Sequence, residues 1–207
     1  MNHLPSLLDT IHRTLIPMKP LKSLFWSLTL FLCTGLSSLA QGDYPTAGSV
    51  LFMKLEGVKS GVVQGEVVQK GREGLHKLLA YSHDITSPRD PASGQATGKR
   101  QHEPFRVVKY VNRASPTLLT MMANNELLKS VTIDIWDANR TGAEQKLITY
   151  TLKNAQIVSL RPWMPNKSDA SAASYGPAEE LAFVYETIQV TWNSGGIVGE
   201  DRWSGVP

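Results

Sequence analysis

The chain contains few side chains of the types that perform catalysis, and their spacing does not assemble an active site. Beyond residue 40 the histidines are His76, His83 and His102, and the single cysteine, Cys33, precedes them. The zinc-protease pattern HExxH, the thiolate pair CxxC and the nucleophile elbow GxSxG do not occur. The sequence therefore predicts no catalytic residue, no metal ligand and no cofactor. A structure in which His76, His102 and a carboxylate surround a cavity would favour an enzyme instead.

Two short stretches contain the residue types of catalytic motifs but lack the spacing or geometry that these motifs require. Ser82, His83 and Asp84 have the residue types of a hydrolase triad. However, neighbours along a strand point to opposite faces and cannot line up as nucleophile, base and orienting acid. Residues 94–99, GQATGK, are one residue short of a phosphate-binding loop, and Arg100 stands where the magnesium-binding Ser or Thr belongs. We interpret both runs as ordinary strand or loop sequence.

The composition is that of one soluble globular domain. Of 207 residues, 42% are hydrophobic and 19% are charged. The formal charge is +3, but residues 1–40 carry three basic residues against one acidic residue, which leaves the rest of the chain at +1. A body so close to neutral argues against nucleic acid as a partner. The acidic pairs Glu179 with Glu180 and Asp134 with Asp137 are interpreted as solvated strand ends.

The first 40 residues have the three-part pattern of a secretion signal. Lys19 and Lys22 form a positive start, residues 24–36 are almost wholly apolar, and residues 38–40, Ser-Leu-Ala, place small residues where signal peptidase cleaves. The apolar run is shorter than the ~20 residues that span a bilayer. We therefore predict a Sec-type signal peptide over residues 1–40 that meets the membrane only transiently and is cleaved after Ala40.

The start of the translated chain has two candidates. Residues 1–17 lack the character of a signal, so Met18 is an alternative to the first methionine. Leu32 before Cys33 argues against a lipoprotein signal, which requires a small residue at that position. In either case the exported portion is predicted to be a single domain over residues 41–207.

The exported portion is rich in strand signals. Apolar, β-branched runs separated by Gly, Pro and Asn predict strands at residues 50–55, 65–70, 75–82, 105–110, 131–135, 145–153, 156–161 and 180–192. The glycines of residues 71–74 predict a hairpin turn, and Asn154 predicts a turn between two strands of a meander. These signals predict a mainly β fold.

One short helix is predicted at about residues 115–125. Ser115 suits the N-cap and Pro116 the first helical position, and residues 124–125, Asn-Asn, offer a polar stop. The apolar side chains expected on one side at the helical period are Leu118, Leu119, Met121 and Met122. We expect this helix to lie against the sheet.

Two features point to contacts with other molecules. Residues 83–104, with three prolines and two glycines, predict a long loop, and such loops in compact domains are usually functional or form interfaces. The strand at residues 180–192 is apolar on both faces, which is typical of a strand central in a sandwich or facing a neighbouring subunit. The predicted subunit interface comprises Phe183, Tyr185, Ile188 and Trp192.

Six blocks of sequence between residues 52 and 203 form a recognisable series: FMKLEGVKSG, QKGREG, SPRDPASGQATGKRQHEPF, VNRASPTLLTMMANNELL, LAFVYETIQVTW and GEDRW. In content, order and spacing they resemble the Hcp family, the haemolysin-coregulated proteins of type VI secretion. The resemblance implies two antiparallel sheets in a barrel-like sandwich with one flanking helix. It further implies a homohexameric ring, stacking of rings into a tube, and a channel that holds or chaperones effector proteins. The implied role is structural rather than enzymatic.

In that family the long loop and the termini mediate ring stacking, which points to residues 87–105 and 199–203 in this chain. The implied partners are further copies of the chain, effector proteins and other type VI secretion components. Both signs of charge on one loop suit docking on a repeated neighbour. The candidate stacking residues are Arg89, Asp90, Lys99, Arg100 and His102.

The leader is a departure from the family, whose members begin a few residues before the first strand and lack a signal peptide. A working signal would place the chain in the periplasm or outside the cell. The alternative function is then an exported β-sandwich binding module that forms no tube. If the leader is a misassigned start, the chain would be cytoplasmic until the type VI machine secretes it.

Overall fold

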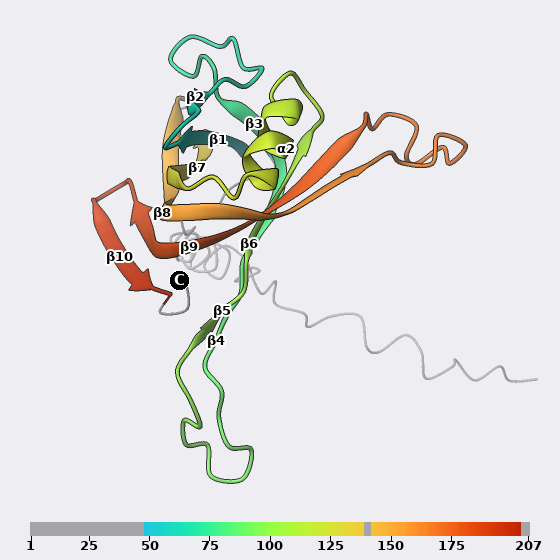
Figure 1. Cartoon of the computed structure of the whole chain (residues 1–207). Helices are drawn as coiled ribbons and strands as arrows, with labels where there is room; N and C mark the ends of the chain where they lie inside the picture. The colour runs from blue at the N-terminus through green and yellow to red at the C-terminus, as the bar shows by residue number, and fades with distance from the viewer. Residues whose placement is uncertain (1–47, 139–141, 204–207) are drawn as a thin grey trace, which may run out of the picture. The chain divides into compact units, whose positions relative to one another are not determined.

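Six strands form a closed antiparallel barrel in the computed structural model of the chain, which describes residues 48–138 and 142–203 (Figure 1). They are β1 Val50–Gly57, β3 His76–Ser82, β6 Phe105–Tyr110, β7 Leu128–Ala138, β8 Glu144–Trp163 and β9 Ala178–Trp192. Their order is β9-β6-β3-β1-β7-β8, and β8 pairs again with β9, which closes the ring. The predicted class, mainly β with antiparallel sheets in a barrel-like arrangement and one short helix, is confirmed.

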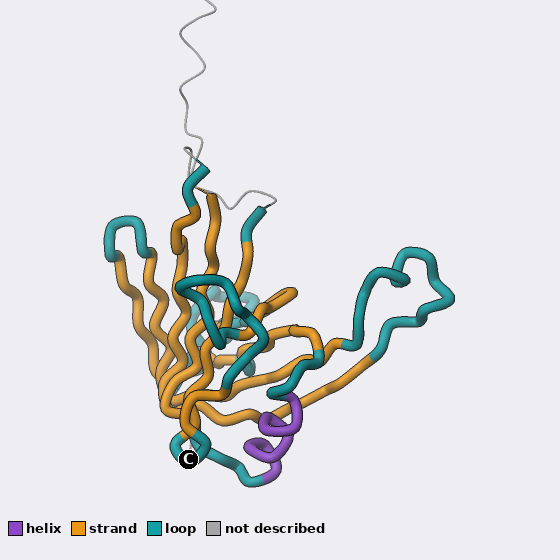
Figure 2. Tube along the Cα trace, turned by 90° about the horizontal axis from the view of Figure 1, so that it is seen from above, coloured by secondary structure: helices purple, strands orange, loops and turns teal. Residues whose placement is uncertain are grey.

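Smaller elements attach to this barrel. They are β2 Gly61–Val63, which pairs with β1; β10 Ile197–Arg202, which pairs with β9; the two-stranded sheet of β4 Ile85–Thr86 and β5 Gln101–His102; and the helix α2 Ser115–Ala123. Figure 2 shows this helix beside the strands. Within the described ranges, no helix has the length and apolar character that crossing a bilayer requires. Strand β10, which was not predicted from the sequence, follows a turn at Gly195 and Gly196, both with positive φ. The predicted signal peptide and its cleavage after Ala40 lie outside the described residues.

The longest strand, β8, takes the place of two predicted strands with a turn between them. Asn154 has a φ of +50°, yet its neighbours Lys153 and Ala155 pair with Thr187 and Tyr185 of β9. The residue bends the strand without reversing it. The predicted meander is therefore wrong here, because Asn tolerates the left-handed conformation both in a turn and in a bend within a strand.

The strand predicted at residues 65–70 is also wrong. Backbone hydrogen bonds close residues 65–75 into a local loop, and Val68 in it is 90% exposed. The β-branched run therefore finds no sheet face to cover. The turn predicted from its glycines is confirmed, because Gly71 and Gly74 have positive φ of 82° and 75°.

The helix begins differently from the prediction. Ala114 is the N-cap residue and Ser115 is already helical. The Ser115 hydroxyl donates to Glu179 at 2.8 Å and accepts from the amide of Asn112 at 3.1 Å. Ser115 therefore ties the helix start to β9 rather than capping the helix.

Only part of the predicted apolar side of the helix faces the barrel. Leu118 and Met121 are buried, Met122 is partly buried, and Leu119 is 57% exposed. The buried pair is three residues apart, so a narrow stripe is enough for this short helix to cover the sheet. The prediction that Leu119 lies on the buried side of the helix is therefore wrong.

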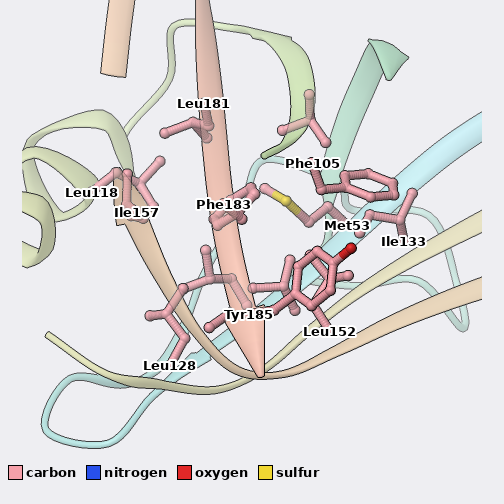
Figure 3. Close-up of a cluster of buried hydrophobic side chains, with 14 of the residues drawn as sticks. Met53, Phe105, Leu118, Leu128, Ile133, Leu152, Ile157, Leu181, Phe183 and Tyr185 are labelled. Carbon is pink, nitrogen blue, oxygen red and sulfur yellow. The ribbon is translucent and has the colours of Figure 1, made fainter. Parts of the chain in front are cut away.

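The barrel interior is an apolar core drawn in part in Figure 3. Alternate residues of each strand point inward, as the period of two in a strand requires. In β7 these are Val131, Ile133 and Ile135, the residues predicted to alternate, and all three are buried. Side chains from β9 that meet them in the core include Leu181, Phe183 and Tyr185.

One end of the interior is polar. The register of β6 and β9 sets Lys109 opposite Glu179, and their side chains form an ion pair of 2.7 Å with exposed fractions of 0% and 2%. Glu179 was interpreted from sequence as a solvated strand end, which is wrong. Its charge is compensated by Lys109 and by the Ser115 hydroxyl, as a buried carboxylate requires.

Removing one partner of this pair should be costly. We expect Lys109→Met to lower the free energy of unfolding by roughly 3–5 kcal/mol, because Glu179 would be left buried without its cation. Urea unfolding at neutral pH measures the loss. The double variant Lys109→Met/Glu179→Leu is the matched control and should recover most of it. A double variant as unstable as the single one would contradict this account.

Candidate functional site at the base of the hairpin arm

Residues 83–104 form a hairpin that leaves the barrel, which we call the arm (Figure 1). Strands β4 and β5 pair with each other, and Arg89 and Ala96 form a further antiparallel bridge. Asp90 closes the tip by accepting hydrogen bonds from the amides of Ala92 and Ser93 at 3.0 and 2.7 Å. The predicted long loop is therefore a two-stranded extension with its own hydrogen bonds.

The arm leaves the sheet because another strand occupies the edge of β9 along which it would continue. β6 pairs with residues 178–183 of β9, ending at Phe105 opposite Phe183. β10 pairs with residues 187–192 on the same edge of β9, with Asp201 opposite Ile188. The chain before Phe105 cannot extend the β6 ladder past this point and turns outward.

A continuous chain of polar contacts holds the base of the arm at this junction. His102 of β5 lies with its Nδ1 2.8 Å from the Tyr185 hydroxyl and its Nε2 3.1 Å from Asp201 Oδ2. The same Tyr185 hydroxyl lies 2.7 Å from Nε2 of His83, and Arg100 pairs with the Asp201 carboxylate. We call these five residues the arm-base network.

Aromatic rings enclose this network. His83 stacks on Phe105 with centroids 5.1 Å apart, and His102 stacks on Trp203 at 6.0 Å. The amide of Trp203 donates to the carbonyl of Glu186 at 2.8 Å, which fixes the chain after β10 against β9. The base of the arm is thus packed, whereas residues 91–101 are all exposed.

The electrostatics of the arm-base network follow from burial and from Arg100. Burial lowers the pKa of His83, with a further lowering from His102 and an opposing contribution from Asp84. Burial raises the pKa of the Tyr185 hydroxyl. Hydrogen bonds from Arg100 are the largest contribution to the lowered pKa of Asp201. The network therefore favours neutral His83, a protonated tyrosine and an ionised aspartate near neutral pH.

The geometry of the arm-base network suits holding the arm in place rather than catalysing a reaction. The hydroxyl, both imidazoles and the carboxylate are already engaged with one another. Residues 48–138 and 142–203 contain no group of three His, Cys, Asp or Glu side chains arranged to hold a metal. His76 is not part of the network, since its Nε2 contacts the carbonyl of Val63 at 3.0 Å. The sequence condition for an enzyme, His76 and His102 together with a carboxylate, is not met.

The sequence matches a known family along most of the described chain. Residues 52–192 match the family described as "Type VI secretion system effector, Hcp". The chain belongs to the Hcp family. The resemblance that the sequence blocks indicated is therefore confirmed.

Individual relatives agree with this assignment. The chain is 31% identical over 161 residues to a Pseudomonas aeruginosa protein named "Major exported protein", covering 73% of this chain and 94% of that one. A solved structure described as "Crystal structure of Hcp protein" is similar with a TM-score of 0.71 and 24% identity, over 76% of this chain and 99% of that chain. The Hcp1 protein from E. coli EAEC 042 is similar with a TM-score of 0.66 and 26% identity, over 74% and 98%.

This Hcp chain places the predicted stacking residues in two groups. Arg89, Asp90 and Lys99 lie along the arm beyond its base, where Arg89 and Lys99 are exposed. Arg100 and His102 instead bind the C-terminal strand through Asp201. His102 is only 4% exposed, so its prediction as a stacking contact is wrong: the arm-base network uses both of its ring nitrogens.

The predicted subunit interface is largely wrong. The side chains of Phe183, Tyr185 and Ile188 are buried in the core of the same protomer. Tyr185 is also in ring contact with His83 and His102 at the arm base and with Trp203. The three buried side chains offer no surface to a neighbour. Trp192 is partly exposed, and its role at an interface stays a prediction.

The two segments that meet in the arm-base network were predicted from the sequence, but their contact with each other was not. Residues 87–105 and 199–203 were both predicted as stacking segments, and the structure brings them together through Arg100, His102 and Asp201. The role of the Tyr185 hydroxyl was missed. Its signal was weak, since His83 and Tyr185 are 102 positions apart in the sequence.

Removing the shared hydroxyl should destabilise this Hcp chain. Tyr185→Phe removes the hydroxyl partner of Nδ1 of the buried His102 and of Nε2 of the half-buried His83, so we expect a loss of about 1–3 kcal/mol in the free energy of unfolding. Urea unfolding at neutral pH measures it. Tyr150→Phe is the matched control, because its hydroxyl makes one longer contact of 3.4 Å to Tyr81. Equal losses in the two variants would contradict a special role for Tyr185.

The stability of the chain should fall on mild acidification. Burial holds the pKa of both His76 and His83 below the usual value of 6.5. The unfolded chain therefore takes up these protons at a higher pH than the folded chain. The free energy of unfolding should be highest above about pH 7 and decrease as the pH falls from 6.5 through the two folded-state pKa values.

Urea unfolding at pH 7.5, 6.5 and 5.5 tests this dependence, in a range where most carboxylates stay ionised. The double variant His76→Gln/His83→Gln cannot take up these protons and should show a flatter profile. A stability that is unchanged or higher at pH 5.5 in the unmodified chain would contradict the account.

Proposed function

We propose that this chain is a structural protein that assembles into homohexameric rings. The rings stack into a tube of the type VI secretion kind, and the channel holds or chaperones effector proteins. The chain acts through self-association and through contacts with other secretion components, and it is not an enzyme. No nucleic acid takes part.

The arm is the observation that carries this proposal. It is a hairpin whose residues 91–101 are exposed throughout and whose base is fixed to the barrel by the arm-base network. Beyond its base, residues 91–101 of the arm are exposed and therefore available to a neighbouring protomer. Arg89, Asp90 and Lys99 along it carry both signs of charge, which suits docking on a neighbouring ring.

Exposed apolar side chains give a second line of support for self-association. Three of them lie where β8 ends and in the loop that leads to β9. They are Trp163, the last residue of β8, and Met164 and Tyr175 in the loop, with exposed fractions of 44%, 56% and 51%. Tyr110 pairs with Ala178, next to this group. Large exposed apolar groups of this kind are typical of protein contacts.

The route of export has two candidates. The relative from Pseudomonas aeruginosa is named a major exported protein, and export of this chain follows from the proposal. Cytoplasmic assembly and secretion by the type VI machine require that residues 1–40 are not used as a leader. A used Sec-type leader, cleaved after Ala40, instead favours the alternative function, an exported periplasmic or secreted binding module. N-terminal sequencing of the native protein separates the two routes.

The oligomer itself is tested in solution. Light scattering coupled to size exclusion of the native protein should give a particle of six protomer masses, and negative-stain microscopy should show rings and tubes. A monomer at high concentration would reject the ring. Rings that never stack would reject the tube alone.

The arm contact has its own charge-reversal test. Lys99→Glu should leave the ring intact and weaken stacking, because the exposed side chain lies on the arm. A loss of about 0.5 kcal/mol per contact, repeated around six protomers, amounts to roughly 3 kcal/mol, or more than a hundredfold in the stacking constant. Lys54→Glu makes the same charge change at an exposed position on β1 and is the control. Tubes equally abundant in both variants would contradict arm-mediated stacking.

A further inference from the structure

The Tyr185 hydroxyl is shared by two histidines from opposite sides of the arm. His83 leads from β3 into the arm, and His102 lies in β5, which leads back to β6. Their nitrogens lie 2.7 and 2.8 Å from the same oxygen. Beyond His102 the chain of contacts continues to Asp201 of β10 at 3.1 Å. Both roots of the arm are therefore fastened to one point on β9.

Counting protons shows when this fastening works. A tyrosine hydroxyl has one proton, so it donates to one histidine and accepts from the other. With both rings neutral, His83 donates to Tyr185, Tyr185 donates to Nδ1 of His102, and Nε2 of His102 donates to Asp201. Every donor then has an acceptor.

A single added proton is also accommodated. If His102 is doubly protonated, its Nδ1 donates to the tyrosine oxygen and the hydroxyl turns to donate to Nε2 of His83. The direction of the chain reverses, but each contact is kept. The charge on His102 faces Asp201, which Arg100 also binds.

Two added protons leave the hydroxyl proton of Tyr185 without an acceptor. Both imidazolium rings would then point an N–H group at the same oxygen, and neither could accept the hydroxyl proton. Their ring centroids are 6.2 Å apart, so the two positive charges would also repel.

We propose that the arm-base network is a proton-operated latch, which holds both roots of the arm on Tyr185 while at least one of His83 and His102 is neutral and weakens this attachment when both are protonated, leaving the contacts with Asp201 in place.

The charged groups around the latch set where it responds. Asp84 beside His83 favours its protonation, whereas the charge of His102 and burial oppose it. Asp201 faces His102 from β10, and Arg100 faces Asp201 from the arm. Burial, as the largest contribution, therefore keeps the pKa of His83 below its usual value of 6.5.

Loss of the Tyr185 attachment lets the arm move about its remaining contacts with Asp201 and leaves the barrel intact. β6 stays paired with both β3 and β9, and Phe105 remains in the core. Among the described residues, the hydrogen bonds and ion pairs that join the arm to β9 or β10 involve His83, Arg100 and His102. The latch lies within one protomer, so the inference does not rest on ring formation.

A distance measurement on the full chain tests the latch. Spin labels are placed by Ala96→Cys at the arm tip and Val198→Cys on β10, both exposed, with Cys33→Ser to remove the native thiol. Labelled protein is diluted with unlabelled protein so that distances are measured within one protomer. Pulsed electron paramagnetic resonance at pH 7.5 should give a single narrow distribution of distances between the two labels. At pH 5.0 that peak should be lost to a broad distribution while circular dichroism still reports an intact barrel.

Two variants give opposite expected results. His83→Gln keeps an N–H donor for the Tyr185 hydroxyl but cannot be charged, so the narrow distance should persist at pH 5.0. Tyr185→Phe removes the shared hydroxyl, so the distribution should be broad even at pH 7.5. The inference is overturned if the unmodified chain keeps its narrow distance at pH 5.0, if the His83→Gln variant opens as the unmodified chain does, or if arm and barrel are lost together.

Discussion

The fold depends on how the two edges of β9 are divided among its partners. Along one edge β9 pairs with β8 from Trp192 to Ala178, and this long ladder closes the barrel. The other edge is divided between β6, at residues 178–183, and β10, at residues 187–192. The short interval between these partners contains Tyr185. Both roots of the arm meet the barrel there, so the division of this edge decides where the arm leaves and what holds it.

This division explains why the C-terminal strand matters to a segment about a hundred positions away. If β10 were absent, the edge of β9 would be open for β6 to extend, because antiparallel pairing continues wherever backbone groups are free. With β10 in place, Arg100 and His102 meet Asp201 instead of the backbone of β9. An exposed projection is thus made from sequence that could otherwise have joined the sheet.

Local sequence patterns predicted the parts of this fold whose causes are local. The period of two in residues 131–135 predicted a half-buried strand, and Val131 and Ile133 are fully buried. Pro116 and residues 124–125 bounded the helix to within two residues. The family blocks at residues 87–105 and 199–203 marked both segments that meet at the base of the arm.

The failures arise where a long-range contact decides the outcome. Asn154 has the same left-handed preference in a bend as in a turn, and only the ladder with β9 selects the bend. Glu179 looked solvated because sequence does not show Lys109 opposite it. Phe183 and Tyr185 looked like interface residues because an apolar side chain has the same sequence signal whether its partner is the same barrel or another subunit.

Imaging the native assembly tests the central claim most directly, namely that this barrel is a ring subunit whose arm is the contact between rings. Electron cryomicroscopy of particles purified from cells should show rings with sixfold symmetry. The arm of each protomer should be seated on the adjacent ring, with its base still against β10. Single barrels, or rings whose arms extend into solvent while the rings stack through another surface, would contradict the account.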